Sequence, residues 1–289
     1  MTTHTDTLTQ AQRISASPAP TGTADFAAEW LRWHARHEEQ RADKHGFLAI
    51  TGLHWLTKDP TRFDDAPGLW STGEAGPVVE LEAGESLVVQ DAEVTGRYEF
   101  GVIAERGSRL ASSGDAALEV ARRGGHDILR PRHPEHVLRT EYVGTPTYAP
   151  DPGWKVEGRF VPFDQPREVT VGAAVEGLLH VYEAPGVVQV EIDGQSMSLT
   201  AFNGHAPGSL LVLFTDATSG ITTYAANRAL NIDAPDADGR VVVDFNRSTN
   251  LPCAYTDFAT CPLPPAENRL AVAITAGEKI PTERGGAAS

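Results

Sequence analysis

The chain is built largely from short apolar strings separated by Gly, Asp and Pro, from about residue 77 to residue 246. Several strings alternate apolar and polar residues, most clearly VVQVEIDG at 187–194. Alternation places successive side chains on opposite faces of a strand, and short runs bounded by turn residues are typical of antiparallel sheets. Asp193 and Gly194 stand where a hairpin turn is expected. The pattern therefore predicts a mainly β fold, either an antiparallel β-sandwich or a β-barrel.

A different pattern occurs near the N-terminus. Phe26, Trp30, Trp33 and His37 recur there at steps of three and four residues, with Glu and Arg between them. This spacing gathers the side chains on one face of an α-helix. Asp25 directly precedes the run and has a suitable side chain for a helix N-cap. The sequence thus predicts an amphipathic helix over residues 25–42, packed on the β fold.

The pattern contains no internal repeat and no clear boundary between domains. Residues 1–22 are rich in Thr, Ser, Ala and Pro without periodicity, which predicts a flexible N-terminal tail. We expect a single β-rich domain over residues 23–283. Residues 284–289 are expected to form a frayed C-terminus.

Charge narrows the classes of partner. The chain has 24 basic and 39 acidic residues and a formal net charge of −15. Nonspecific binding to nucleic acid and to anionic membranes depends on Lys and Arg, so neither partner is expected. A local group of arginines still suits one small anion, and a small anionic molecule is the expected partner. The oligomeric state is left open, with a homodimer among the alternatives.

The compartment is predicted from the lack of a recognisable targeting signal and from the two cysteines. No apolar stretch near the N-terminus resembles a signal-peptide core, and no run of about 18 apolar residues could cross a membrane. We therefore expect a cytoplasmic protein. In a reducing compartment Cys253 and Cys261 are interpreted as buried thiols rather than a structural disulfide.

Standard cofactor and metal motifs are missing. The sequence has no P-loop, no dinucleotide-binding glycine motif, no nucleophile elbow and no H-E-x-x-H motif, so no cofactor is expected. Two histidine pairs, His34 with His37 and His133 with His136, have a spacing of three residues. Neither pair is accompanied by acidic or Cys ligands at a diagnostic spacing. We predict no metal site and interpret these histidines as surface or capping residues.

Residues 214–279 are unusually rich in polar side chains between apolar strands. Asp216 follows a buried strand, Asp244 and Asn246 flank Phe245 at a strand end, and three prolines between 262 and 265 predict a stiff arm. A structural interpretation exists for each part, since Asp residues close turns and Asp244 could pair with Arg247 within the fold. The alternative is a rigid loop system that brings polar groups together around a pocket. We adopt the pocket as the leading hypothesis.

The hypothesis assigns a role to each residue. Asp244 is the candidate general base and Tyr224 the candidate proton donor. Cys253 is a candidate nucleophile with His54 or His205 as its base, although a packed thiol is the favoured interpretation. The candidate substrate-binding residues, whose arginines would hold a carboxylate or phosphate, are Arg228, Asn246, Arg247, Arg269 and Asp216.

The same segments carry a resemblance to a known family. FTDATSGITTYAANRAL, DFNRSTNLPC, TCPLPPAENRL and AGEK resemble the bacterial and archaeal proteins called domain of unknown function 1684, as do GFLAITGLHWL and WKVEGRF. The resemblance covers roughly residues 25 to 281. It implies one mainly β domain with an N-terminal helix and implies no known reaction. His133 departs from the family pattern, in which an Asp is expected at this position.

Three functions follow as hypotheses. The leading one is a cofactor-independent enzyme of hydrolase or lyase type that acts on an anionic substrate in a pocket built by residues 214–279. The second is a non-catalytic binding protein for a small anionic ligand, which needs the arginines but no proton-transfer pair. The third is a protein-interaction module that uses the proline arm and the Trp-bearing helix.

Overall fold

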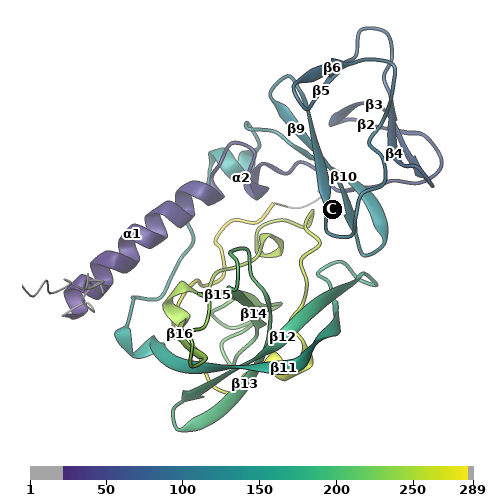
Figure 1. Ribbon diagram of the computed structural model, residues 1–289. Helices are drawn as coiled ribbons and strands as arrows, with labels where there is room; N and C mark the ends of the chain where they lie inside the picture. Colours follow the sequence, from purple (N-terminus) through teal and green to yellow (C-terminus); the bar gives the residue numbers. More distant parts are fainter. Residues whose placement is uncertain (1–21, 286–289) are drawn as a thin grey trace, which may run out of the picture.

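A computed structural model describes residues 22–285. Antiparallel strands dominate this range, and one long helix, α1 (Thr23–Arg41), stands at its start (Figure 1). The predicted mainly β fold with an N-terminal amphipathic helix is therefore confirmed. No helix in the described range is both long enough and apolar enough to cross a membrane.

Helix α1 begins earlier than the sequence predicts. Its N-cap is Gly22, and Asp25 lies in the first turn, where its charge favours the positive end of the helix dipole. The prediction that Asp25 is the N-cap is thus wrong. Phe26 and Trp30 are buried, as expected from their spacing. The indole N–H of Trp30 donates to the backbone carbonyl of Asn246 at 2.8 Å, so that the helix is attached to the C-terminal β region.

Two antiparallel sheets form the N-terminal β region. The first has the order β1-β10-β9-β8-β5-β6 and the second the order β2-β3-β4-β7. Their bounds are β1 (His54–Trp55), β2 (Thr61–Phe63), β3 (Ala66–Gly73), β4 (Gly76–Glu80), β5 (Leu87–Val89), β6 (Ala92–Val94), β7 (Arg97–Glu99), β8 (Ser108–Ser113), β9 (Ala116–Arg123) and β10 (His126–Arg132). Both sheets contribute to one hydrophobic cluster around Trp70, Leu118, Val120 and Leu129.

One antiparallel sheet forms the C-terminal β region, with the order β15-β14-β13-β12-β11-β16. Its bounds are β11 (Lys155–Gly172), β12 (Leu179–Ile192), β13 (Gln195–Asn203), β14 (Leu210–Phe214), β15 (Arg228–Ile232) and β16 (Arg240–Asp244). The predicted hairpin turn joins β12 to β13. Asp193 and Gly194 both have positive φ, of 51° and 72°, as the tight hairpin turn requires.

Short helices connect and cover these sheets. They are η1 (Phe47–Ala49), α2 (Val137–Thr140), η2 (Pro152–Trp154), η3 (Phe245–Arg247), η4 (Pro252–Ala254) and η5 (Ala266–Asn268). Asn268 fixes the proline-rich arm to the C-terminal sheet. Its side chain donates to the carbonyls of Thr200 and Leu213 at 2.9 and 2.8 Å, and accepts from Thr200 N–H at 2.8 Å. The arm therefore covers the sheet through buried hydrogen bonds.

Each β region has its own large hydrophobic cluster, and Figure 1 shows the two regions as separate bodies that meet below β10. The C-terminal cluster includes Val188, Val212, Phe214 and Val243. A single folding unit over residues 23–283 stays a prediction. Of the two predicted flexible ends, residues 1–21 and 286–289 lie outside the described residues.

Candidate functional site

Strands β9 and β10 direct apolar residues to one face and a group of charged residues to the other. Side chains alternate between the two faces of a strand. The apolar face joins the N-terminal hydrophobic cluster through Leu118, Val120 and Leu129. The opposite face carries Glu119, Arg123, Arg130 and Arg132, together with the buried pair Ala121 and Ile128. Glu119 and Arg130 are direct partners across the ladder, so the register of the hairpin brings these charges together.

Glu119 holds the three arginines, which we call the arginine cluster (Arg123, Arg130 and Arg132). Its carboxylate accepts from Nε and Nη2 of Arg130 at 3.0 and 2.9 Å, a paired contact, and from Nη2 of Arg123 at 3.0 Å. It also accepts from Arg132. Burial by itself raises the pKa of the Glu119 carboxyl, but Arg130 and Arg132 outweigh burial and lower this pKa to about 2. Glu119 is therefore ionised at neutral pH.

The arginine cluster carries more charge than Glu119 neutralises. Three guanidinium groups contact the single carboxylate of Glu119, and the Glu105 carboxylate also acts on Arg123, which leaves one positive charge in excess. Burial lowers the pKa of Arg123, Glu119 opposes this effect, and repulsion from Arg130 lowers the pKa further. Buried charges are normally paired, so this cluster favours an added anion.

The C-terminal β region provides the opposite wall. His180 on β12 is 3% exposed, and its Nε2 lies 2.7 Å from the carbonyl oxygen of Thr260. Tyr182, two residues further along β12, lies under Arg106, whose guanidinium carbon is 4.5 Å from the ring centre. Among residues 22–285, neither Nδ1 of His180 nor Nε of Arg132 has a hydrogen-bond partner, although both atoms are buried.

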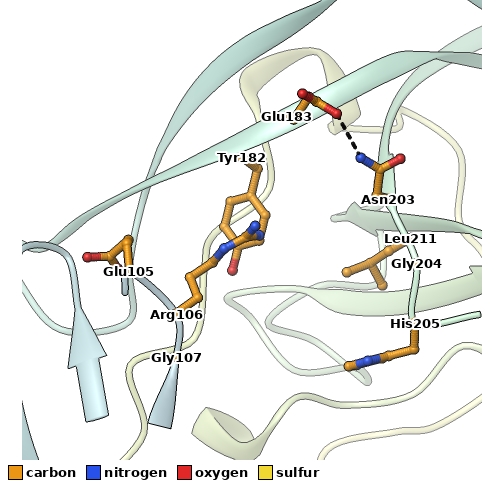
Figure 2. Close-up of a pocket in the computed structure, with 9 residues that line it drawn as sticks. All are labelled: Glu105, Arg106, Gly107, Tyr182, Glu183, Asn203, Gly204, His205 and Leu211. Carbon is orange, nitrogen blue, oxygen red and sulfur yellow. Dashed lines mark hydrogen bonds between the residues drawn. The ribbon is translucent and has the colours of Figure 1, made fainter. Parts of the chain in front are cut away.

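These walls border two adjoining cavities, both open to solvent. The arginine cavity, about 410 Å³ in volume, is lined by the arginine cluster, His180 and the loop at 259–262. The outer cavity, about 630 Å³ in volume, is lined by Glu105, Glu183 and Asn203, among others. Both cavities share Arg106, Tyr182 and His205, and Figure 2 shows Arg106 lying across Tyr182 with His205 on the other side of the outer cavity. Volumes of this size are typical of small-molecule sites.

His205, one of the two alternative bases for Cys253, lines both cavities, but the eight residues given catalytic or binding roles from sequence lie elsewhere, in three groups. The first is a buried ion pair in which Arg228 donates to Asp216 at 2.7 Å. Arg228 is 1% exposed and also donates to the backbone carbonyls of Ile274 and Ala276. Asp216 accepts from the N–H and hydroxyl of Thr218 at 2.7 and 2.6 Å. The pair therefore ties the strand ends to the C-terminal segment, and its hydrogen bonds are already directed to the protein itself.

Tyr224 and Cys253 form the second group. The Tyr224 hydroxyl donates to the Cys253 carbonyl at 2.8 Å, and the Cys253 N–H donates to Sγ of Cys261 at 3.3 Å. Both thiols are free and buried. A hydrogen bond from Cys261 lowers the pKa of the Cys253 thiol, whereas the pKa of the Cys261 thiol is raised well above its usual range by the same hydrogen bond and by burial. The two cysteines are in contact, and Cys261 also lines the arginine cavity.

The third group surrounds Asp244, which caps helix η3. The carboxylate accepts from N–H and Nδ2 of Asn246 at 3.1 and 2.9 Å, and Nε of Arg247 lies 3.4 Å away. Arg247 also donates to Glu29 of helix α1 at 2.7 Å. Within the described range no hydrogen bond joins Asp244 to Tyr224. Arg269, the last candidate, is exposed.

None of these eight candidates lines either cavity described above. The arginine cluster and the two residues His180 and Tyr182 were missed. One signal was present in the sequence, because Arg130 and Arg132 alternate in a strand and must share a face. Their partner Glu119 becomes visible only from the register of β9 against β10.

One cluster of a histidine and two glutamates has the spacing of a metal site. Among the described residues, ligand atoms of His34, Glu38 and Glu278 lie within 4.8 Å of one another. However, Arg41 donates to Glu38 at 2.7 Å and to Glu278 at 2.6 Å. The Arg41 guanidinium already contacts both carboxylates, so the cluster is better explained as the buried attachment of helix α1.

Fold and site together define a mainly β protein with an arginine-lined cavity between two β regions. The chain belongs to the family described as protein of unknown function (DUF1684), whose model matches residues 140–279. A solution NMR structure of an uncharacterized protein of Haloarcula marismortui is similar, with 31% identity, coverage of 49% of this chain and 78% of that chain, and a TM-score of 0.41. No curated protein matches the chain.

Proposed function

We propose that the protein binds a small molecule bearing a phosphate or a carboxylate, with the anionic group in the arginine cavity. The observation that carries the proposal is the arginine cluster, in which three guanidinium groups share the single carboxylate of Glu119. Planar guanidinium groups bind the oxygens of phosphate and carboxylate by paired hydrogen bonds.

The net charge of −15 bears on the size of the ligand. A surface with this charge repels extended polyanions, whereas a cavity lined by one sign of charge still attracts a small ion locally. The arginine cavity measures about 410 Å³ and is bounded by residues of both β regions. A small metabolite therefore fits the site better than a nucleic acid does.

Calorimetric titration with inorganic phosphate, at constant ionic strength in chloride buffer, tests the proposal. Arg130→Met keeps most of the side-chain volume and removes the guanidinium, and we expect phosphate affinity to fall roughly tenfold or more. Because Arg130 also binds Glu119, Arg106→Met serves as a second variant outside that carboxylate contact. Arg122→Met is the matched control, since Arg122 neighbours Arg123 in sequence but pairs with Asp127.

Two results would overturn the proposal. One is the absence of phosphate binding and of carboxylate binding, the latter probed with citrate, by the folded wild-type protein. The other is binding that both Arg130→Met and Arg106→Met leave unchanged. Loss of affinity in Arg122→Met as well would place the anion on the other face of β9.

A second candidate function, acid–base catalysis on the bound anion, is favoured by Tyr182 and His205. These two residues belong to the wall shared by both cavities, between the arginine cluster and the outer cavity. Burial raises the pKa of Tyr182 although Arg106 opposes this, so its hydroxyl keeps a proton to donate. The version with Asp244, Tyr224 and Cys253 has less support, because the hydrogen bonds of Asp244 and of Tyr224 go to different neighbours.

Turnover of phosphate esters, followed by ³¹P NMR, tests this second function. We expect His205→Gln to abolish turnover while phosphate binding persists. Wild-type protein that binds phosphate but returns every ester unaltered would leave binding as the function and exclude catalysis on this class.

A further inference from the structure

The outer cavity differs in chemistry from the arginine cavity that it adjoins. Its polar groups are the carboxylate of Glu183, the amide of Asn203 and the imidazole of His205, whereas the Glu105 carboxylate already accepts from the N–H groups of Gly124 and Gly125. Carboxylates only accept hydrogen bonds when ionised, so they repel a second anion and select groups that donate. The two cavities are therefore suited to opposite ends of one ligand.

Two features of the outer cavity favour hydroxyl groups. Glu183 accepts from Asn203 at 3.1 Å, which orients an acceptor and an amide side by side, as the dashed line in Figure 2 shows. A hydroxyl both donates and accepts, and therefore matches such a pair. An ammonium group only donates and would also meet the positive charge of Arg106 at the shared wall. A polyhydroxylated group therefore satisfies this cavity better than an amine.

The surroundings of Tyr182 disfavour a ligand with a nucleobase stacked on its ring. Aromatic side chains in ligand sites commonly stack on bases, but the guanidinium of Arg106 lies 4.5 Å from the ring centre of Tyr182. The Tyr182 ring also packs against Phe202, with ring centres 5.0 Å apart. With Arg106 over the ring and Phe202 beside it, the ring is already engaged by the protein.

We infer that the ligand is a sugar phosphate, with the phosphate in the arginine cavity and the sugar hydroxyls in the outer cavity at Glu183, Asn203 and His205. This inference rests on the proposed anion binding and adds the chemical class of the ligand. The shared wall of Arg106, Tyr182 and His205 lies where the ester oxygen joins the two parts.

Titration of the full chain with inorganic phosphate, ribose 5-phosphate, ribose and AMP tests the inference. We expect ribose 5-phosphate to bind roughly tenfold tighter than inorganic phosphate, because hydroxyl hydrogen bonds to a carboxylate are charge-assisted. Glu183→Ala and Asn203→Ala should each remove most of this advantage and leave the affinity for inorganic phosphate unchanged. Glu191→Ala, exposed on the same strand as Glu183, is the matched control and should change neither affinity.

The outcomes separate the two levels of the argument. If inorganic phosphate and ribose 5-phosphate both fail to bind, anion binding itself is refuted. If phosphate binds and ribose 5-phosphate gains nothing, or if its gain survives both Glu183→Ala and Asn203→Ala, only the sugar-phosphate assignment fails. AMP binding roughly tenfold tighter than ribose 5-phosphate would replace the sugar with a nucleoside and overturn the assignment as well.

Discussion

Replacing Glu119 by Gln is the most direct perturbation of the arginine cluster. The change keeps the shape and one carbonyl oxygen, but removes the carboxylate that contacts all three guanidinium groups. The pKa of Glu119 is lowered from its ordinary value of 4.5 to about 2 in the folded protein, and the residue is 5% exposed. A shift of this size corresponds to about 3 kcal/mol of stability at neutral pH. Breaking a buried ion pair has a similar measured cost, about 3–5 kcal/mol.

Calorimetric unfolding measures this loss. About 3 kcal/mol should lower the melting temperature of Glu119→Gln by roughly 6–12 °C in a chain of this size. A carboxyl whose folded pKa is depressed stabilises the protein above its unfolded pKa, and this stability is lost as pH falls toward the folded pKa. The difference between wild type and variant should therefore be full at pH 7 and shrink between about pH 4.5 and pH 2.

Phosphate gives this experiment a second readout. An added anion replaces the missing counter-charge, so phosphate should raise the melting temperature of Glu119→Gln more than that of the wild type. Glu168→Gln, exposed on β11, is the control and should match the wild type in both respects. A loss no larger than the control's, or one that stays constant from pH 7 to pH 3, would refute the role assigned to Glu119.

Three further predictions concern other parts of the fold. Burial and Arg41 lower the pKa of His37 to about 4 in the folded protein. Between about pH 6.5 and pH 4 the unfolded chain therefore takes up a proton at this residue that the folded protein does not. The folded protein loses stability as pH falls through that window. Urea unfolding should show less acid sensitivity in His37→Gln, and parallel pH profiles would contradict the assignment. Arg228→Met should lower the free energy of unfolding by about 3–5 kcal/mol, because it leaves Asp216 buried and unpaired. The double variant that adds Asp216→Asn should recover part of this loss. A single variant as stable as wild type in calorimetry would count against a structural pair. Asn268→Ala leaves three backbone groups of Thr200 and Leu213 without partners and should cost about 3 kcal/mol or more in calorimetry, whereas a loss below about 1 kcal/mol would show that water replaces the amide.

The sequence predicts those parts of the fold that depend on local pattern. Alternating apolar residues give the antiparallel strands, Asp193 and Gly194 give a hairpin turn, and the spacing of Phe26 and Trp30 gives the buried face of helix α1. The error at Asp25 is one of helix boundary, and boundaries depend on the last turn rather than on the apolar period.

The candidate site is predicted less well because polar density has two physical causes. Residues 245–285 cross the sheets with little regular structure, so their backbone groups need side-chain partners. Arg228, Asn246 and Asn268 meet this need, and their polar character reflects packing of loops rather than a cavity. The sequence alone does not separate this cause from ligand binding.

The arginine cavity depends on tertiary register. Arg130 and Arg132 share a strand face by local alternation, but Glu119 reaches them only through a specific hairpin register. His180 and Tyr182 approach from a strand some fifty residues further along the chain. No local pattern links these two segments. The match to family DUF1684, over residues 140–279, includes His180 and Tyr182 but not the arginine cluster.

The position of the ligand cavities between the two β regions also bears on how the protein unfolds. Each region has its own hydrophobic cluster, which allows two melting steps when the cavities are empty. A ligand that touches both walls is bound only while the regions face each other, and at one hundred times its Kd it adds about 2.7 kcal/mol to that arrangement. Ligand binding would then act as a cross-link between the regions and merge their melting into one cooperative transition.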